Sequence, residues 1–144
     1  MALCLLAISA TLPCPLAGAE EPTVEDLKAR LTAATIPDRP HICIEIAKKQ
    51  AASSDKLYAA NDFDQAQIAL NDVVAYSELA RDYAIQSHKY QKQTEIAVRE
   101  FARKLGDLMR TLPQDDKPPV QDAINRLQKI RDDLLAAMFP KGVK

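Results

Sequence analysis

Glycine and proline are nearly absent from the middle of this sequence. Between Pro40 and Pro113 there is no proline, and Gly106 is the one glycine. A sheet needs frequent turns, and glycine and proline are the residues that most often mark them. So long a tract without either residue argues against a sheet and favours an all-α protein.

The sequence also lacks an excess of charge of either sign. Its 144 residues hold 19 basic and 20 acidic side chains, for a formal net charge of −1. Nucleic-acid-binding domains usually carry a strong basic excess, so nucleic acid is not expected as a partner. With 47% hydrophobic and 27% charged residues, the composition is that of one globular domain with a modest core.

The first nineteen residues contain no charged side chain. They form an apolar run that ends in Ala17-Gly18-Ala19, the small-x-small pattern of a signal-peptidase site. No Lys or Arg precedes the run, so either the true start lies upstream or the signal is atypical. The alternative is a short buried helix; a membrane span is disfavoured because the run is short and contains Pro13 and Pro15. We expect a signal peptide over residues 1–19 and an exported bacterial protein, periplasmic or extracellular, with no stable membrane span after cleavage.

Cysteine is scarce once the signal is removed. Cleavage would take away Cys4 and Cys14 and leave Cys43 alone. A lone cysteine cannot form an internal disulfide in an oxidising compartment. We expect a small buried hydrophobe at this position, and an intermolecular or mixed disulfide is the alternative.

Helix signals divide the mature chain into two parts. Thr23, followed by Glu25 and Asp26, begins a short helix, and Pro37 and Pro40 end it in a rigid connector. Residues 20–40 are therefore a short N-terminal helix and a proline-rich connector, and residues 41–139 a helical bundle domain. The segment "HICIEIAKK" alternates like a strand, but its neighbours are helix formers, so we predict a helix over residues 41–60.

The stretch "LYAANDFDQAQIAL" predicts the bend of a helical hairpin. Asn61 tolerates the left-handed conformation that ends a helix, and Asp62 can cap the next one. From Phe63 an apolar stripe runs on to Leu112. No Pro or Gly interrupts residues 86–95, so we favour one continuous helix, although a break there would give a compact up-and-down bundle.

A last helix follows the connector "PQDDKPP" and runs to about Met138, with six apolar side chains on one face. Short connectors make neighbouring helices antiparallel. The predicted fold is therefore all-α, with antiparallel helical hairpins sharing one long central helix in an elongated three- or four-helix bundle.

Two resemblances bear on this fold. The segment Ala47–Val74 resembles one tetratricopeptide repeat, because Asp62, Phe63 and Ala66 match its turn while Asn61 replaces its glycine. No second copy follows at a period near 34 residues, so this resemblance implies a single hairpin. At the level of the whole chain, segments such as "RPHICIEIAKKQ" and "PPVQDAINRLQKIRDDLL" resemble an uncharacterised family of small secreted bacterial helical proteins, which implies export and a helical fold and no activity.

Two groups of residues are candidates for chemistry. His41, Cys43 and Glu45 could ligate a metal or ligand or take part in redox chemistry, but side chains two apart on a helix diverge by about 200°. His88 is the one other histidine, far along the chain. Because no metal, catalytic or cofactor motif accompanies them, we expect no metal, no cofactor and no enzyme.

Tyr76, Tyr83 and Tyr90 recur at a spacing of seven and would line one stripe of the long helix. Such a stripe is a candidate interface. Acids dominate residues 55–82 and bases dominate residues 89–110, a distribution suited to self-pairing or to a charged partner. The sequence thus favours a non-enzymatic exported protein that acts by protein–protein interaction with an unknown partner or itself. The alternative is a small-ligand or metal-binding helical module of the cell envelope.

Overall fold

The computed structural model describes residue 18 and residues 20–142. The predicted signal peptide lies, apart from Gly18, outside this part of the chain. The described residues form five α-helices and no strand: α1 Val24–Ala33, α2 Arg39–Ala59, α3 Phe63–Ser87, α4 Gln91–Met109 and α5 Lys117–Met138. The predicted all-α helical bundle is confirmed.

Helix α1 begins where the sequence predicts. The hydroxyl of Thr23 accepts from the backbone N–H of Asp26 at 3.1 Å, and the Asp26 carboxylate accepts from the N–H of Thr23 at 3.0 Å. This capping box satisfies two N–H groups that the first turn leaves free. After a 3₁₀ turn at Ile36–Asp38, α2 already begins at Arg39 with Pro40 in its first turn, so the predicted extended connector is shorter than expected.

The first hairpin joins α2 to α3 by the predicted bend. Asn61 adopts a left-handed conformation with φ of 59°, and the carboxylate of Asp62 accepts from the N–H of Gln65 at 3.4 Å. The two helices then pack closely along their length, and small side chains such as Ala47, Ser54 and Ala80 are fully buried in them.

The prediction of one continuous helix from Phe63 to Leu112 is wrong. Helix α3 ends at Ser87, and His88 and Tyr90 both adopt left-handed conformations, with φ of 58° and 62°. Each costs about 1–2 kcal/mol for a residue other than glycine. Reversal of the chain brings both apolar stripes into one core, where each large side chain such as Phe101 contributes about 1.5–3 kcal/mol. Burial therefore outweighs the strain of the turn.

The second hairpin consists of α4 and α5. Helix α4 ends at Met109, and a connector with a 3₁₀ turn at Gln114–Asp116 leads into α5. Its core contains large side chains such as Phe101, Leu127 and Leu134. It also holds a buried carboxylate, because the Glu95 side chain is 8% exposed and accepts from Nε of Arg131 at 2.7 Å.

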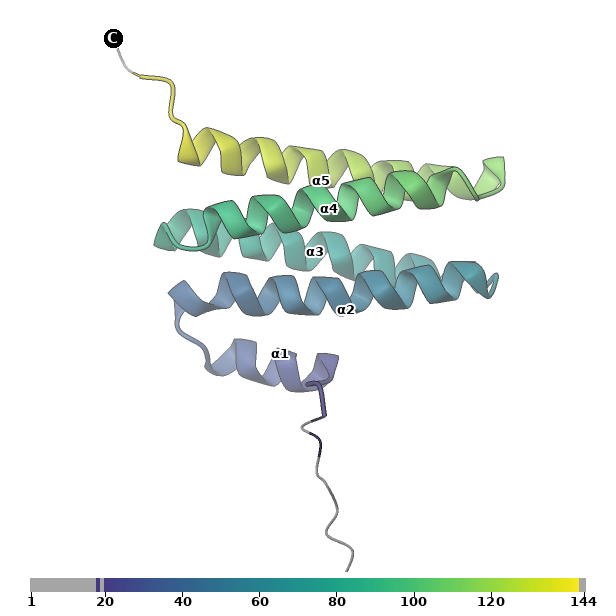
Figure 1. Cartoon of the computed structure of the whole chain (residues 1–144), viewed down its shortest axis with the longest axis horizontal. Coiled ribbons are helices and arrows are strands. Elements are labelled where there is room, and N and C mark those ends of the chain that lie inside the picture. Colours follow the sequence, from purple (N-terminus) through teal and green to yellow (C-terminus); the bar gives the residue numbers. More distant parts are fainter. Residues whose placement is uncertain (1–17, 19, 143–144) are drawn as a thin grey trace, which may run out of the picture.

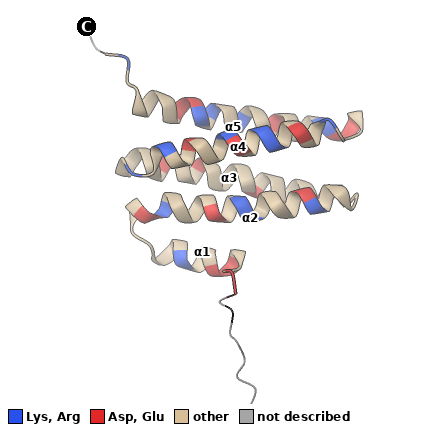
Figure 2. Ribbon diagram, in the orientation of Figure 1, with Lys and Arg blue, Asp and Glu red and all other residues tan. Residues whose placement is uncertain are grey.

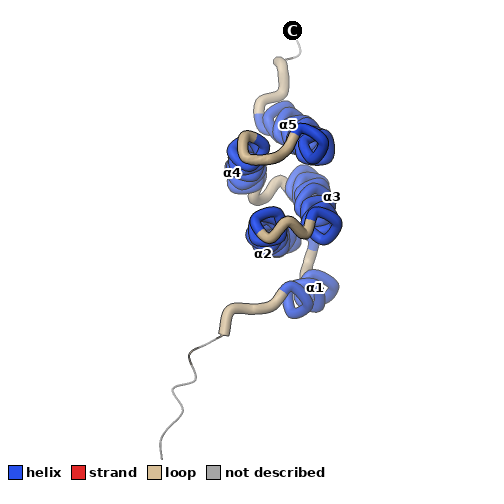
Figure 3. Tube along the Cα trace, turned by 90° about the vertical axis from the view of Figure 1, so that its right-hand side faces the viewer, coloured by secondary structure: helices blue, strands red, loops and turns tan. Residues whose placement is uncertain are grey.

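The helices alternate between two layers. Neighbouring helices run antiparallel in the order α1 to α5 (Figure 1). Viewed end-on, α2 and α4 lie in one layer and α1, α3 and α5 in the other (Figure 3). Each hairpin thus contributes one helix to each layer, and one core of buried residues extends over both hairpins.

The burial pattern of α3 recurs in α5 at an offset of 54 residues. The pairs that are buried in both helices are Ala66 and Val120, Ala69 and Ala123, Leu70 and Ile124, Val73 and Leu127, and Ala80 and Leu134. The triplet Glu-Ile-Ala occurs in α2 at residues 45–47 and again in α4 at 95–97. The chain therefore places two similar hairpins side by side, at a period longer than that of a tetratricopeptide array.

Candidate binding groove between helices α2 and α4

A groove runs between α2 and α4, the two helices of one layer. Two hollows of about 400 Å³ and about 280 Å³ share Lys48, Ala97 and Glu100, so they form one continuous depression. We call it the α2–α4 groove. Its α2 side includes His41, Ile44, Lys48, Ala51, Ala52 and Asp55. Its α4 side includes Tyr90, Thr94, Ile96, Ala97, Glu100 and Lys104.

The groove exists because α2 and α4 each pack mainly against their own hairpin partner and touch each other less. Alanines at the seam, such as Ala51 and Ala97, are too small to fill the space between the helix axes. The larger Ile96 stands on the rim with 44% of its surface exposed. The floor is therefore apolar, and two large side chains of the groove, Ile96 and Tyr90, remain exposed to solvent.

The floor also contains a polar atom without a partner. Thr94 is 1% exposed, lines the larger hollow, and its hydroxyl forms no hydrogen bond to another described residue. Buried hydroxyls almost always have a partner, because leaving one unsatisfied costs free energy. Thr94 therefore combines a side chain at the larger hollow with an unsatisfied hydroxyl that is itself shielded from solvent.

The sequence-predicted residues His41 and Cys43 are not brought together. His41 lies at the end of the groove, where its ring stacks on that of Tyr90 with 5.9 Å between the ring centroids. The Nε2 atom of His41 lies 3.1 Å from the Glu45 carboxylate. Cys43 is fully buried in the core, as expected for a small hydrophobe, and burial raises the pKa of its thiol to about 12. The thiol therefore stays protonated near neutral pH.

The expected row of three tyrosines is divided by the end of α3. Tyr76 packs against the cluster around Leu27, and the Tyr83 hydroxyl accepts from Nη1 of Arg39 at 3.2 Å. Tyr90 lies before α4 and faces the groove. The prediction that one helix stripe carries all three rings is wrong, because the helix ends at Ser87.

Charged side chains line both rims of the groove. Nη2 of Arg103 donates a hydrogen bond to the Glu100 carboxylate at 2.6 Å. This hydrogen bond lowers the pKa of the Glu100 carboxyl. Across the groove, desolvation raises the pKa of Asp55, and the positive charge of Lys104 opposes that effect. Lys48, Lys104 and Asp55 form no ion pair with another described residue, so two bases and one acid of the groove are open to a partner.

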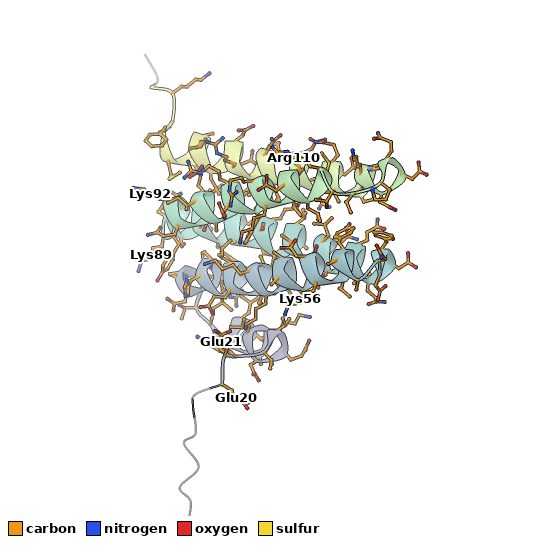
Figure 4. All side chains as sticks on the ribbon, turned by 45° about the vertical axis from the view of Figure 1, so that its right-hand side comes forward. Glu20, Glu21, Lys56, Lys89, Lys92 and Arg110 are labelled. Carbon is orange, nitrogen blue, oxygen red and sulfur yellow. The ribbon has the colours of Figure 1, made fainter. Side chains whose placement is uncertain are left out.

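The wider surface around the groove is basic. Helices α2 and α4 together carry eight bases and five acids, whereas α3 carries four acids and one base (Figure 2). Lys89 and Lys92 lie together at the end of the bundle where α3 gives way to α4 (Figure 4). The α2 and α4 layer is thus positive relative to the surface of α3.

The described residues that line the groove include one histidine and no cysteine or serine. Within residues 20–142, no three His, Cys, Asp or Glu side chains gather at a distance suited to a metal. No helix in the same part of the chain is long and apolar enough to cross a membrane.

Sequence reasoning missed the groove residues Lys48, Ile96 and Lys104. One signal was available: Ile96 is the large apolar residue on a face of α4 that is otherwise charged or polar. The neighbouring helix that makes such a residue part of a groove could be identified only once the reversal at residues 88–90 was known.

Comparison with known proteins finds no matching family model, no similar curated protein and no similar solved structure.

Proposed function

We propose that this chain is an exported, non-enzymatic protein whose α2–α4 groove binds an amphipathic helical segment of another protein. The observation that carries the proposal is the open groove with an apolar floor between two parallel-lying helices of one layer. An amphipathic helix can lay its apolar face into such a groove and direct its polar face to solvent.

The shape and the rims support a helical segment as the bound group. The two hollows extend from His41 to Asp55 along α2, about four turns of helix. Lys48 and Lys104 stand on opposite rims and would meet acidic side chains on the flanks of the bound helix. Layered helical hairpins commonly present such extended binding faces, and the local resemblance of Ala47–Val74 to a tetratricopeptide hairpin agrees with this use.

A photo-crosslinking experiment tests the groove. A benzoylphenylalanine placed at Ile96 should form an adduct with a partner in the native envelope, because this side chain stands on the rim. The matched control places the same group at Gln128, an exposed polar position on α5. Adding Ala52→Arg, which fills the groove from an exposed position, should abolish the adduct at Ile96. Equal adducts at both positions, or an adduct that Ala52→Arg leaves unchanged, would contradict the proposal.

Export is tested separately. Cleavage after Ala19 would give a mature protein that begins at Glu20. Mass spectrometry of the protein from the envelope or medium of its host should find this N-terminus. A chain that keeps residues 1–19 and stays in the cytoplasm would contradict export but not binding by the groove.

A second function is favoured by Thr94. Thr94 and Tyr90 line the larger hollow, and the unpaired Thr94 hydroxyl is buried there; a small apolar ligand that enters this position with one hydrogen-bonding group would satisfy it. A thermal-shift screen with fatty acids, aromatic acids and alcohols should then find a stabilising compound. Thr94→Val removes the hydroxyl without changing the volume much, and it should weaken that response. A uniformly flat response would contradict this second function.

A further inference from the structure

Helix α3 presents an apolar ridge on the outer surface of the second layer. Ile68 and Leu79 are 56% and 38% exposed, and Ala75 is exposed between them. Spacings of seven and four residues place all three on one face of a helix. We call these three residues the α3 ridge. Acidic side chains flank it, namely Asp64, Asp72 and Asp82.

The α3 ridge is short enough to lie along the α2–α4 groove. The ridge extends over twelve residues from Ile68 to Leu79, and the α2 side of the groove extends over fifteen residues from His41 to Asp55. At a rise of 1.5 Å per residue the ridge is about 17 Å long and the groove about 21 Å. Of the large apolar side chains that are exposed in the described chain, Ile68 and Leu79 belong to the ridge, and Tyr90 and Ile96 to the groove.

The two surfaces also match in charge. The ridge lies on a helix with four acids and one base, and that base, Arg81, is already paired with Asp82 and with Asp133 of α5. The groove lies between helices with an excess of bases, and Lys48 and Lys104 on its rims are open to a partner. Potentials of opposite sign steer and orient association.

We propose that the helix bound by the α2–α4 groove is α3 of a second copy of this chain. This inference rests on the proposed function, because it names the amphipathic helix that the groove accepts. The ridge and the groove lie on opposite layers (Figure 3), so the contact joins two different surfaces. Each added copy leaves one free ridge and one free groove, and such heterologous contacts continue into open chains unless their rotation closes a ring.

Sedimentation velocity of the mature chain over a range of concentrations tests this assembly. We expect species larger than a dimer as concentration rises. Ile68→Lys disables the ridge and Ile96→Lys disables the groove, and both side chains are exposed enough for the fold to tolerate the change. Each variant should self-associate about tenfold or more weakly, the usual effect of losing a central apolar contact. Ile36→Lys, at an isoleucine that is 37% exposed and belongs to neither surface, is the matched control and should assemble as the parent does.

Mixing the two disabled variants gives the decisive readout. The Ile68→Lys chain keeps its groove and the Ile96→Lys chain keeps its ridge, so an equimolar mixture should form a one-to-one pair and nothing larger. A strict monomer at high micromolar concentration, a mixture that does not pair, or variants that assemble as the parent does would each overturn self-assembly. If the chain is monomeric while Ile96 still crosslinks to a different protein, self-assembly fails and the proposed function stands. If Ile96 gives no adduct either, both fail.

Discussion

The two hairpins follow the same path with different side chains. In the first, buried positions of α3 hold small residues such as Ala66 and Ala80; the corresponding positions in α5 hold Val120 and Leu134. The first hairpin also turns in a tight bend at Asn61 and Asp62, whereas the second uses the connector from Arg110 to Asp116.

This difference separates two ways of stabilising a helix pair. Small side chains let helix axes approach closely, and α2 and α3 indeed make the most extensive contact of any two helices in the described chain. Large side chains hold the axes further apart but remove more apolar surface from water, at about 25 cal/mol per Å². The first hairpin should therefore be sensitive to added volume, and the second to lost volume.

The largest expected effect is loss of volume in the second hairpin. Leu134 is fully buried in the core, and Leu134→Ala should lower the free energy of unfolding by about 3 kcal/mol, from lost burial and the cavity left behind. Urea denaturation followed by circular dichroism measures this change. A loss below about 1 kcal/mol would mean that the second hairpin does not depend on its large side chains.

Added volume in the first hairpin should cost somewhat less. Ala80 is the counterpart of Leu134 and is also fully buried. Ala80→Leu should lower the free energy of unfolding by about 2 kcal/mol, because close-packed helices must move apart to accept it. The same change at exposed Ala29 of α1 is the control and should be nearly neutral. A neutral Ala80→Leu would show that the first interface has spare room.

The buried carboxylate of the second hairpin predicts a smaller effect. Arg131→Gln leaves Glu95, which is 8% exposed, without its close cation, and should cost about 1–2 kcal/mol in the free energy of unfolding. Arg126→Gln is the matched control, since its pair with Glu78 bridges α5 and α3 at the surface and should be worth less than about 0.5 kcal/mol. Thermal melts of the two variants compare them directly, and equal shifts would mean that Glu95 is solvated.

The smallest effect concerns the turns. His88 is exposed and left-handed with φ of 58°, so His88→Gly removes strain, partly offset by greater freedom of the unfolded chain, and should stabilise by about 0.5 kcal/mol. Asn61→Gly should change stability less, because asparagine already tolerates this conformation. Chemical denaturation checks both. A destabilised His88→Gly would indicate that the imidazole stabilises the reversal.

Local signals in the sequence were sufficient for most of the helices. The capping residues Thr23 and Asp62 and the left-handed Asn61 were predicted from their side-chain chemistry, and the spacing of apolar residues predicted α5. The sequence favours a continuous helix over a break within residues 86–95, because no glycine or proline marks the reversal at His88 and Tyr90. It is stabilised by the burial of residues that are distant in sequence, which a local pattern does not reveal.

The groove depended on that same reversal. If α3 and α4 formed one continuous helix, α2 and α4 would not be neighbours. Lys48, Ile96 and Ala97 would then share no site. His41 and Tyr90 were each noted as candidates from the sequence, and the structure brings their rings into contact at 5.9 Å. The two rings meet because the two hairpins pack together. Neither residue belongs to a sequence motif that predicts this contact.

The reversal between His88 and Tyr90 also has a consequence for how the protein behaves on a charged matrix. It places the basic residues of α4 in the layer opposite α3, so the layer of α2 and α4 carries three more bases than acids, whereas α3 carries three more acids than bases, although the net charge of the chain is −1. A cation-exchange resin interacts with the side that faces it and not with the average charge. The protein should therefore be retained on such a resin above its isoelectric point near 6.1, adsorbed by the α2 and α4 side and eluted by modest salt.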